Sequence, residues 1–355
     1  MARLSLKALW GLCVVCALLS ACGENHTPEI DGYAEARRLA AAGKYTAAVA
    51  ACKQVLEADS QHIEARLLLA RLDLTQGRLG LAAQLAEQAV QLAPDHTNAY
   101  ALLGNIYVRQ RRNADAAAIY QEGLRTDPDR VDLYRKLAIA HADDGRYSEA
   151  IKTLQQALER AADDPAIHYN LGVIYERQAQ YDNASDAFIR TTELDTTYGD
   201  AYFRLGQIQS KQGQVAGAAS NFARVIRLRP DYAPPYIGLG QIFVQQGRLD
   251  EAERLFKQAA TIDPFAAEAY HRLATLILRQ GDQERGEQLL TIFKRIQPVS
   301  GEIERFRYIL SLSPADADAH YNLGVLYGGL QRYAEAAVEY AAALKINDKD
   351  ISARN

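Results

Sequence analysis

The chain has 355 residues, of which 48% are hydrophobic, and a formal net charge of −4. This apolar fraction, with so little net charge, excludes a disordered chain and suffices for a large core or for a repeat array. Because the chain is weakly acidic and has no run of lysine and arginine, it lacks the electrostatic footprint of a nucleic-acid-binding protein and that of a polybasic membrane patch.

The first 22 residues have the three parts of a secretory leader. Arg3 and Lys7 precede an apolar run, "ALWGLCVVCALL" (8–19), and small residues follow it up to Cys22. A run of this length is too short for a comfortable membrane span and is typical of a signal peptide.

The residues "LSAC" (19–22) resemble the lipobox of bacterial lipoproteins. The resemblance implies that residues 1–21 are a lipoprotein signal peptide and that Cys22 carries acyl chains that hold it at a membrane. Residues 22–30 then form a short tether. In Gram-negative lipoproteins an aspartate after the cysteine favours retention at the inner membrane, so Gly23 favours the outer membrane, on its periplasmic side. The alternative is an ordinary signal peptide that is cleaved after "SAC".

A period of 34 residues runs through most of the chain. It is set by a column of leucines: Leu69, Leu103, Leu137, Leu171, Leu205, Leu239 and Leu273. A small residue follows each leucine, and a tyrosine or histidine stands three places before most of them. A second column is also small: Ala82, Ala116, Ala150, Ala184, Ala218, Ala252 and Gly286. Prolines close many of the units: Pro94, Pro128, Pro230, Pro264 and Pro298.

Each unit predicts two helices joined by a turn. In "AYALLGNIYVRQ" (99–110) the apolar and small residues recur at i, i+3, i+4 and i+7, which is the spacing of one helical face. The second half of the unit, "ADAAAIYQEGLRTDP" (114–128), repeats the pattern before its proline. Small residues in both columns let the paired helices approach closely. Because one unit cannot bury its own apolar face, the units must stack into a solenoid.

These columns resemble the tetratricopeptide repeat family. The resemblance implies an all-α fold, a right-handed superhelix of helix–turn–helix repeats. Nine units are expected: 29–62, 63–96, 97–130, 131–164, 165–198, 199–232, 233–266, 267–300 and 317–350. The first unit is degenerate, which is typical of a capping repeat.

Two irregularities stand out near the C-terminal end. Residues 301–316 are extra and predict a lone second helix that ends at Pro314, so we expect a phase break after the array at 31–300. The C-terminal unit at 317–350 is then expected to pack somewhat apart. The final residues, "DKDISARN", do not read as a polar capping helix. The last apolar face is therefore expected to be covered by a partner or a second copy, unless the sequence is truncated.

No constellation of catalytic or metal-binding residues is evident. The seven histidines stand at no metal-ligand spacing, and nucleotide-binding loops and the nucleophile elbow are absent from the sequence. We therefore expect no enzyme activity, no metal and no cofactor.

The resemblance implies that the first helix of each unit lines a concave face. Every fourth residue along these helices predicts an apolar stripe of Tyr169, Phe203 and Ile237, with Arg177 and Lys211 at its edge. The predicted partner-binding groove comprises Asn105, Arg109, Tyr169, Arg177, Phe203, Gln207, Lys211, Ile237, Gln241, His271 and Arg279. The alternative is that these side chains are solvated or packed against neighbouring helices.

The sequence thus predicts a lipid-anchored scaffold that binds other proteins or peptides in the bacterial cell envelope. The family resemblance suggests roles in pilus assembly, outer-membrane biogenesis or polysaccharide export. No nucleic-acid partner is expected, and a homo-oligomer through the last repeat is open. The alternative function is a periplasmic lipoprotein that binds a small ligand or a glycan, since a solenoid surface also suits such molecules.

Overall fold

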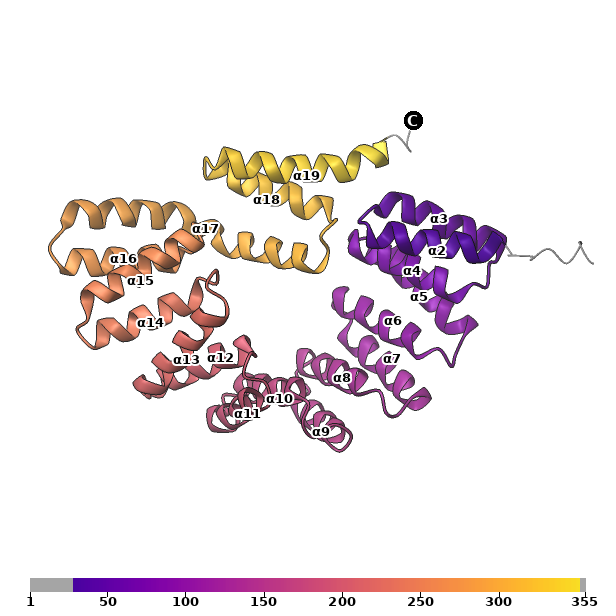
Figure 1. Ribbon diagram of the computed structural model, residues 1–355, viewed down its shortest axis with the longest axis horizontal. Coiled ribbons are helices and arrows are strands. Elements are labelled where there is room, and N and C mark those ends of the chain that lie inside the picture. The colour runs from indigo at the N-terminus through magenta and orange to yellow at the C-terminus, as the bar shows by residue number, and fades with distance from the viewer. Residues whose placement is uncertain (1–27, 352–355) are drawn as a thin grey trace, which may run out of the picture. The chain divides into compact units, whose positions relative to one another are not determined.

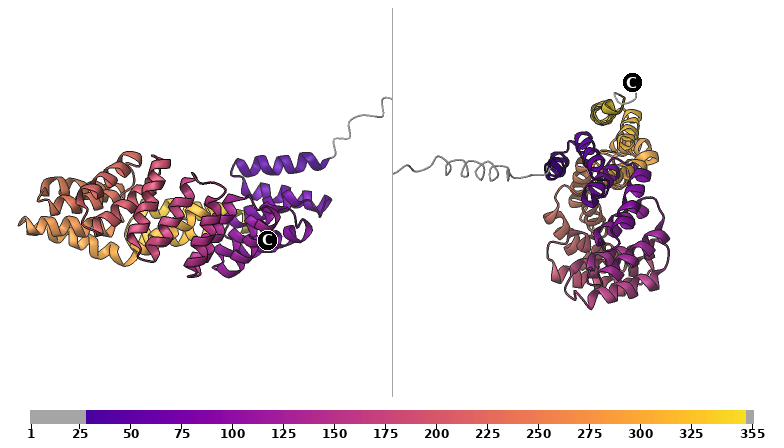
Figure 2. Two further views of the ribbon diagram at one scale, coloured as in Figure 1. Left: turned by 90° about the horizontal axis from the view of Figure 1, so that it is seen from below. Right: turned by 90° about the vertical axis from the view of Figure 1, so that its right-hand side faces the viewer.

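A computed structural model describes residues 28–351, and all regular secondary structure within this range is helical (Figure 1, Figure 2). The leader, Cys22 and most of the tether lie outside the described residues. The helices are α2 (Pro28–Ala41), α3 (Tyr45–Ala58), α4 (Ile63–Thr75), α5 (Leu79–Leu92), α6 (Thr97–Arg109), α7 (Asn113–Thr126), α8 (Val131–Asp143), α9 (Tyr147–Leu158), α10 (Pro165–Arg177), α11 (Tyr181–Leu194), α12 (Gly199–Lys211), α13 (Val215–Leu228), α14 (Pro234–Gln245), α15 (Leu249–Ile262), α16 (Ala267–Arg279), α17 (Gln283–Leu312), α18 (Ala317–Gly329) and α19 (Tyr333–Ile351).

The chain divides into two compact units, residues 1–72 and 73–355. In the first unit α2 packs on α3, and Ala36, Ala48 and Cys52 are fully buried. In the second unit each first helix packs on the second helix of its own pair and on that of the preceding pair, as α6 does with α7 and α5. The prediction of stacked helical pairs is confirmed.

Glycines in the first helices allow the two helices of a pair to approach closely. A Cβ atom built on Gly172 would lie 2.6 Å from the ring of Phe188, and one on Gly240 would lie 2.6 Å from the ring of Phe256. Both rings are almost completely buried. The small residue after each leucine is therefore a steric requirement, because a larger side chain would occupy the place of the facing ring.

A single residue with positive φ joins the two helices of most pairs. Gly213 has φ +74° in the turn between α12 and α13, and Ala179 has φ +56° in the corresponding turn between α10 and α11. For an L-residue this left-handed conformation costs about 1–2 kcal/mol.

We expect Ala179→Gly to raise the free energy of unfolding by about 1 kcal/mol, because glycine adopts this conformation without steric cost. Gly213→Ala is the matched reverse change, and nothing lies within 4 Å of the added Cβ, so only the backbone is tested. We expect it to lower the free energy of unfolding by a similar amount. Urea denaturation measures both, and effects of the same sign would contradict the assignment.

The predicted lone helix at 301–316 is wrong as a separate element. Residues 283–312 form one continuous helix, α17, with Pro298 inside it. The expectation that Pro298 closes a unit fails because the helix is stabilised on both sides of it: Ile296 and Ile303 are buried in one core cluster. This burial offsets the hydrogen bond that proline removes. Figure 1 shows the first part of α17 beside α16 and the second part beside α18.

The last helical pair does not pack apart from the array. Phe265, in the turn before α16, stacks on Tyr327 of α18 with ring centroids 4.6 Å apart. Arg307 of α17 donates hydrogen bonds to the Asp263 carboxylate at 3.0 Å and to the Tyr327 hydroxyl at 3.1 Å. The second half of α17 thus takes the place of a first helix between two repeats, and the core continues through it.

Candidate protein-interaction surface

The first helices of the pairs form the inner face of the second unit. Consecutive first helices contact one another, α6 with α8, α8 with α10, α12 with α14 and α14 with α16. Figure 1 shows α6 and α8 on the inner side of the curve and α7 and α9 on its outer side. The side chains that project from the even-numbered helices, away from their paired helices, therefore share one face.

Two pairs of aromatic rings lie on this inner face, one from each of two consecutive repeats. Tyr169 of α10 packs against Tyr198, in the turn before α12, with centroids 4.9 Å apart. Phe203 of α12 packs edge-on against Tyr232, in the turn before α14, with centroids 5.4 Å apart. All four rings are partly exposed. We call Tyr169, Tyr198, Phe203 and Tyr232 the aromatic stripe.

A charged group holds the aromatic stripe in place. Arg204 donates hydrogen bonds to the Tyr169 hydroxyl at 3.2 Å and to the Glu176 carboxylate at 2.7 Å. Burial opposes the charge on Arg204, but its bonds to Tyr169 and Glu176 outweigh burial, so its pKa lies above the ordinary value. Burial, with a contribution from Tyr169, raises the pKa of Tyr198 to about 12. At neutral pH the tyrosines are therefore uncharged donors beside a paired arginine.

Arg177 and Lys211 stand at the edge of the inner face, as predicted. The Arg177 guanidinium lies 2.6 Å from the Asp143 carboxylate, and both side chains are substantially exposed. The Lys211 ammonium lies 5.6 Å from the centre of the Tyr181 ring. Gln207, one helical turn after Phe203, is exposed. An exposed ion pair of this kind contributes little stability, so both charges are available to a partner.

Further along the array the predicted groove residues are less uniform. Ile237 is only 7% exposed and belongs to the core around Phe256, so it is a packing residue. Gln241 is half-buried and donates a hydrogen bond to Glu268 at 3.2 Å. His271 is exposed, with its ring 4.9 Å from that of Phe293, and Arg279 is exposed.

Asn105 and Arg109 have structural partners. The Asn105 side-chain oxygen accepts a hydrogen bond from the buried Tyr120 hydroxyl at 2.9 Å. Arg109 donates to the Ser313 hydroxyl at 2.8 Å, and Ser313 donates in turn to the Leu74 carbonyl at 3.0 Å. Ser313 is fully buried. Arg109 therefore joins α6 to the end of α17, where the sequence analysis placed it in a groove.

Sequence reasoning missed Tyr198, Tyr232 and Arg204. The first two precede the helices that it scanned, yet each lies 29 residues after the groove residue that it contacts. The same spacing relates Arg135 to Asp164, whose charged groups are 3.9 Å apart. A search for contacts at this second spacing would have found all three pairs.

The described residues offer no other arrangement that suggests chemistry. Within residues 28–351 no three of the His, Cys, Asp and Glu side chains are grouped as they would be around a metal ion. In the same part of the chain no helix combines the length and apolar character needed to cross a bilayer.

The fold and the inner face define an α-solenoid, the class of protein that presents an extended surface to other proteins. Two tetratricopeptide repeat profiles match the sequence, one over residues 101–165, 135–198, 169–233 and 303–351, the other over 39–81, 209–277 and 243–292. The first alone covers more than half of the chain. The chain belongs to the tetratricopeptide repeat family and is a protein-interaction scaffold of that family.

Solved structures of similar fold agree with this assignment. The C-terminal part of a TPR repeat-containing protein from Cytophaga hutchinsonii is 17% identical, with a TM-score of 0.53, and the match covers 68% of this chain and 99% of that one. PilF from Pseudomonas aeruginosa is 19% identical, with a TM-score of 0.51, over 60% of this chain and 96% of that one. MamA from Desulfovibrio magneticus RS-1, from residue 41 onward, is 21% identical with a TM-score of 0.44, over 47% and 95%. The first two likenesses show the fold. No curated protein matches the sequence.

Proposed function

We propose that this protein is a lipid-anchored scaffold of the bacterial cell envelope that binds partner proteins and performs no catalysis. The observation that carries the binding role is the aromatic stripe, four partly exposed rings from two consecutive repeats on one inner face. Aromatic side chains beside arginine are the usual anchors of a protein-binding surface. The stripe, with Arg177 and Lys211 at its edge, fits an extended segment of a partner that carries apolar and acidic side chains.

The envelope location rests on the leader and on Cys22. "LSAC" followed by Gly23 supports an anchor at the outer membrane, facing the periplasm. The tether 22–30 is short, so the array would stay within a few tens of ångströms of its membrane, at roughly 3.5 Å per extended residue. Pilus assembly, outer-membrane biogenesis and polysaccharide export are the envelope processes that such a scaffold would serve.

Replacing Phe203 and Arg177 together by alanine is expected to reduce capture of the partner at least tenfold, because the change removes one aromatic anchor and one charge from the same face. Cross-linking in intact envelopes followed by purification of the chain measures capture and identifies the partner. The matched control is Ile189→Ala with Arg190→Ala, on the second helix α11, where both side chains are exposed. Equal capture by the two double variants would refute the inner face as the binding surface.

Labelling cells with palmitate tests the anchor. The wild-type chain is expected to take up the label and to fractionate with membranes, and Cys22→Ser is expected to do neither, since the thiol is the acceptor. An unlabelled wild-type chain in the periplasmic fraction would contradict the lipoprotein assignment without touching the binding proposal. A rise in melting temperature with oligosaccharides, in place of protein capture, would favour the glycan-binding alternative.

A further inference from the structure

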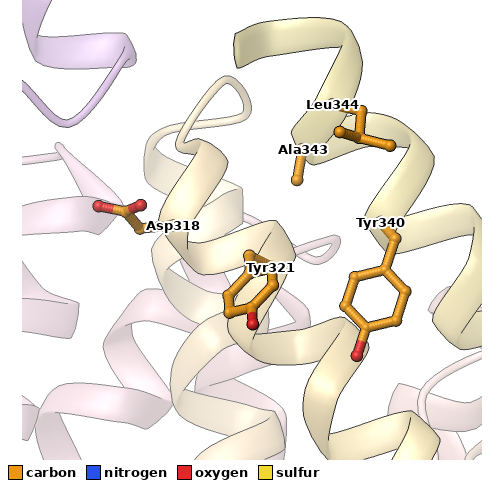
Figure 3. A pocket seen from close by; sticks show the side chains of 5 residues that line it. All are labelled: Asp318, Tyr321, Tyr340, Ala343 and Leu344. Atoms are coloured by element: carbon orange, nitrogen blue, oxygen red, sulfur yellow. The ribbon is translucent and has the colours of Figure 1, made fainter. Parts of the chain in front are cut away.

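The last helical pair presents apolar side chains that earlier pairs bury. Tyr321 of α18 is 57% exposed and Leu344 of α19 is 65% exposed. Together with Tyr340 and Ala343 they surround an open cavity of about 310 Å³, with Asp318 at its edge (Figure 3). We call these five residues the α18/α19 face. Contiguous exposed apolar surface of this kind marks a site of association.

The repeat itself shows what normally covers such a face. In the pair α10–α11, the residues that correspond to Tyr340 and Ala343 are Phe188 and Thr191, and both are fully buried. Leu205 and Ile208 of the next helix, α12, share a core cluster with Phe188. In the pair α12–α13 the corresponding ring is Phe222, which packs with Leu239 and Ile242 of α14. The natural cover is thus a helix with leucine and isoleucine three residues apart.

The first helix of this chain does not offer that cover. At the positions of Leu205 and Ile208, α2 carries Glu35 and Arg38, which form an exposed ion pair at 2.7 Å. This charged pair does not complement an apolar face, so a second copy cannot extend the solenoid by placing its α2 on α19. Self-association through the α18/α19 face then requires the same face on both copies, which is the arrangement of a two-fold dimer.

We propose that two copies of the chain associate about a two-fold axis through their α18/α19 faces. The exposed Leu344 of each copy would fill the open cavity of the other. The face also carries one acid, Asp318, and is flanked by one base, the exposed Lys345. A two-fold pairing can set each acid opposite the base of the second copy, so the charges are self-complementary. This inference rests on α18 and α19 alone and does not depend on the inner face.

Sedimentation equilibrium of the purified full chain, in density-matched detergent, tests the proposal. The wild-type chain is expected to be a dimer, and Leu344→Glu and Tyr321→Glu are each expected to weaken the dimer at least tenfold, because a carboxylate would be buried without a partner. Leu81→Glu is the matched control: Leu81, on α5, is 52% exposed, and its replacement is expected to leave the dimer intact.

A charge exchange keeps the proposal testable even if a variant fails to fold. Asp318→Lys alone is expected to weaken the dimer, and adding Lys345→Asp is expected to restore it. A monomeric wild-type chain, a dimer that none of these changes on the face weakens, or a mass that grows without limit would each overturn the proposal. The last outcome would mean end-to-end stacking.

Discussion

Replacing Phe188 by alanine is expected to lower the free energy of unfolding by about 3–5 kcal/mol. Phe188 is fully buried and lies at the junction of two repeats. Its ring contacts Tyr169 of its own repeat, with centroids 5.7 Å apart, and it shares a core with Leu205 and Ile208 of the next. The cavity left by alanine would therefore weaken both the pair α10–α11 and its interface with α12.

Urea denaturation followed by circular dichroism measures this loss. The neighbouring residue provides the control, because Ile189 on the same helix is 39% exposed and Ile189→Ala is expected to cost under about 1 kcal/mol. In a repeat array each repeat is stabilised mainly by its neighbours, so Phe188→Ala is also expected to broaden the unfolding transition. A loss no larger than that of Ile189→Ala would show that the α10–α12 interface is wrong.

Gly104→Ala is expected to lower the free energy of unfolding by about 1–3 kcal/mol, although alanine favours helices more than glycine does. A Cβ at residue 104 would overlap the ring of Tyr120, with two of the ring carbons at 2.6 Å. The ring cannot move aside easily, since it is buried and its hydroxyl is bonded to Asn105.

Gly80→Ala provides the contrast, because Gly80 is helical and nothing lies within 4 Å of its added Cβ. There the change is expected to raise the free energy of unfolding by about 0.5–1 kcal/mol through helix propensity alone. Thermal and urea unfolding of the two variants measure the difference. If both variants gained stability, the close approach of α6 and α7 at Gly104 would be refuted.

The helical pairs could be predicted because the contacts that define them are local and recur. Gly172 and Phe188 lie 16 residues apart, and the same spacing of small residue and ring returns at Gly240 and Phe256. Pro298 misled the prediction, because a proline ends a helix only where burial on its far side does not favour continuing it. The buried Ile303 provides that burial, and no local rule around Pro298 announces it.

The candidate site was predicted in part for a related reason. Tyr169 and Phe203 follow the helical period and were found, whereas Tyr198 and Tyr232 belong to turns, where the period of a helix does not apply. The role of Arg109 could not be predicted at all. Its partner Ser313 is 204 residues away, and no repeat in the sequence relates the two.

That distant contact has a kinetic consequence. A solenoid whose repeats contact only their neighbours can fold from any point, since every contact is short in sequence. The Arg109–Ser313–Leu74 bonds instead close a loop of more than two hundred residues, and the entropy of closing it is lost only after the intervening repeats have formed. This clasp therefore forms last in folding and opens first in unfolding. Arg109→Ala should accordingly speed unfolding and leave the rate of folding unchanged.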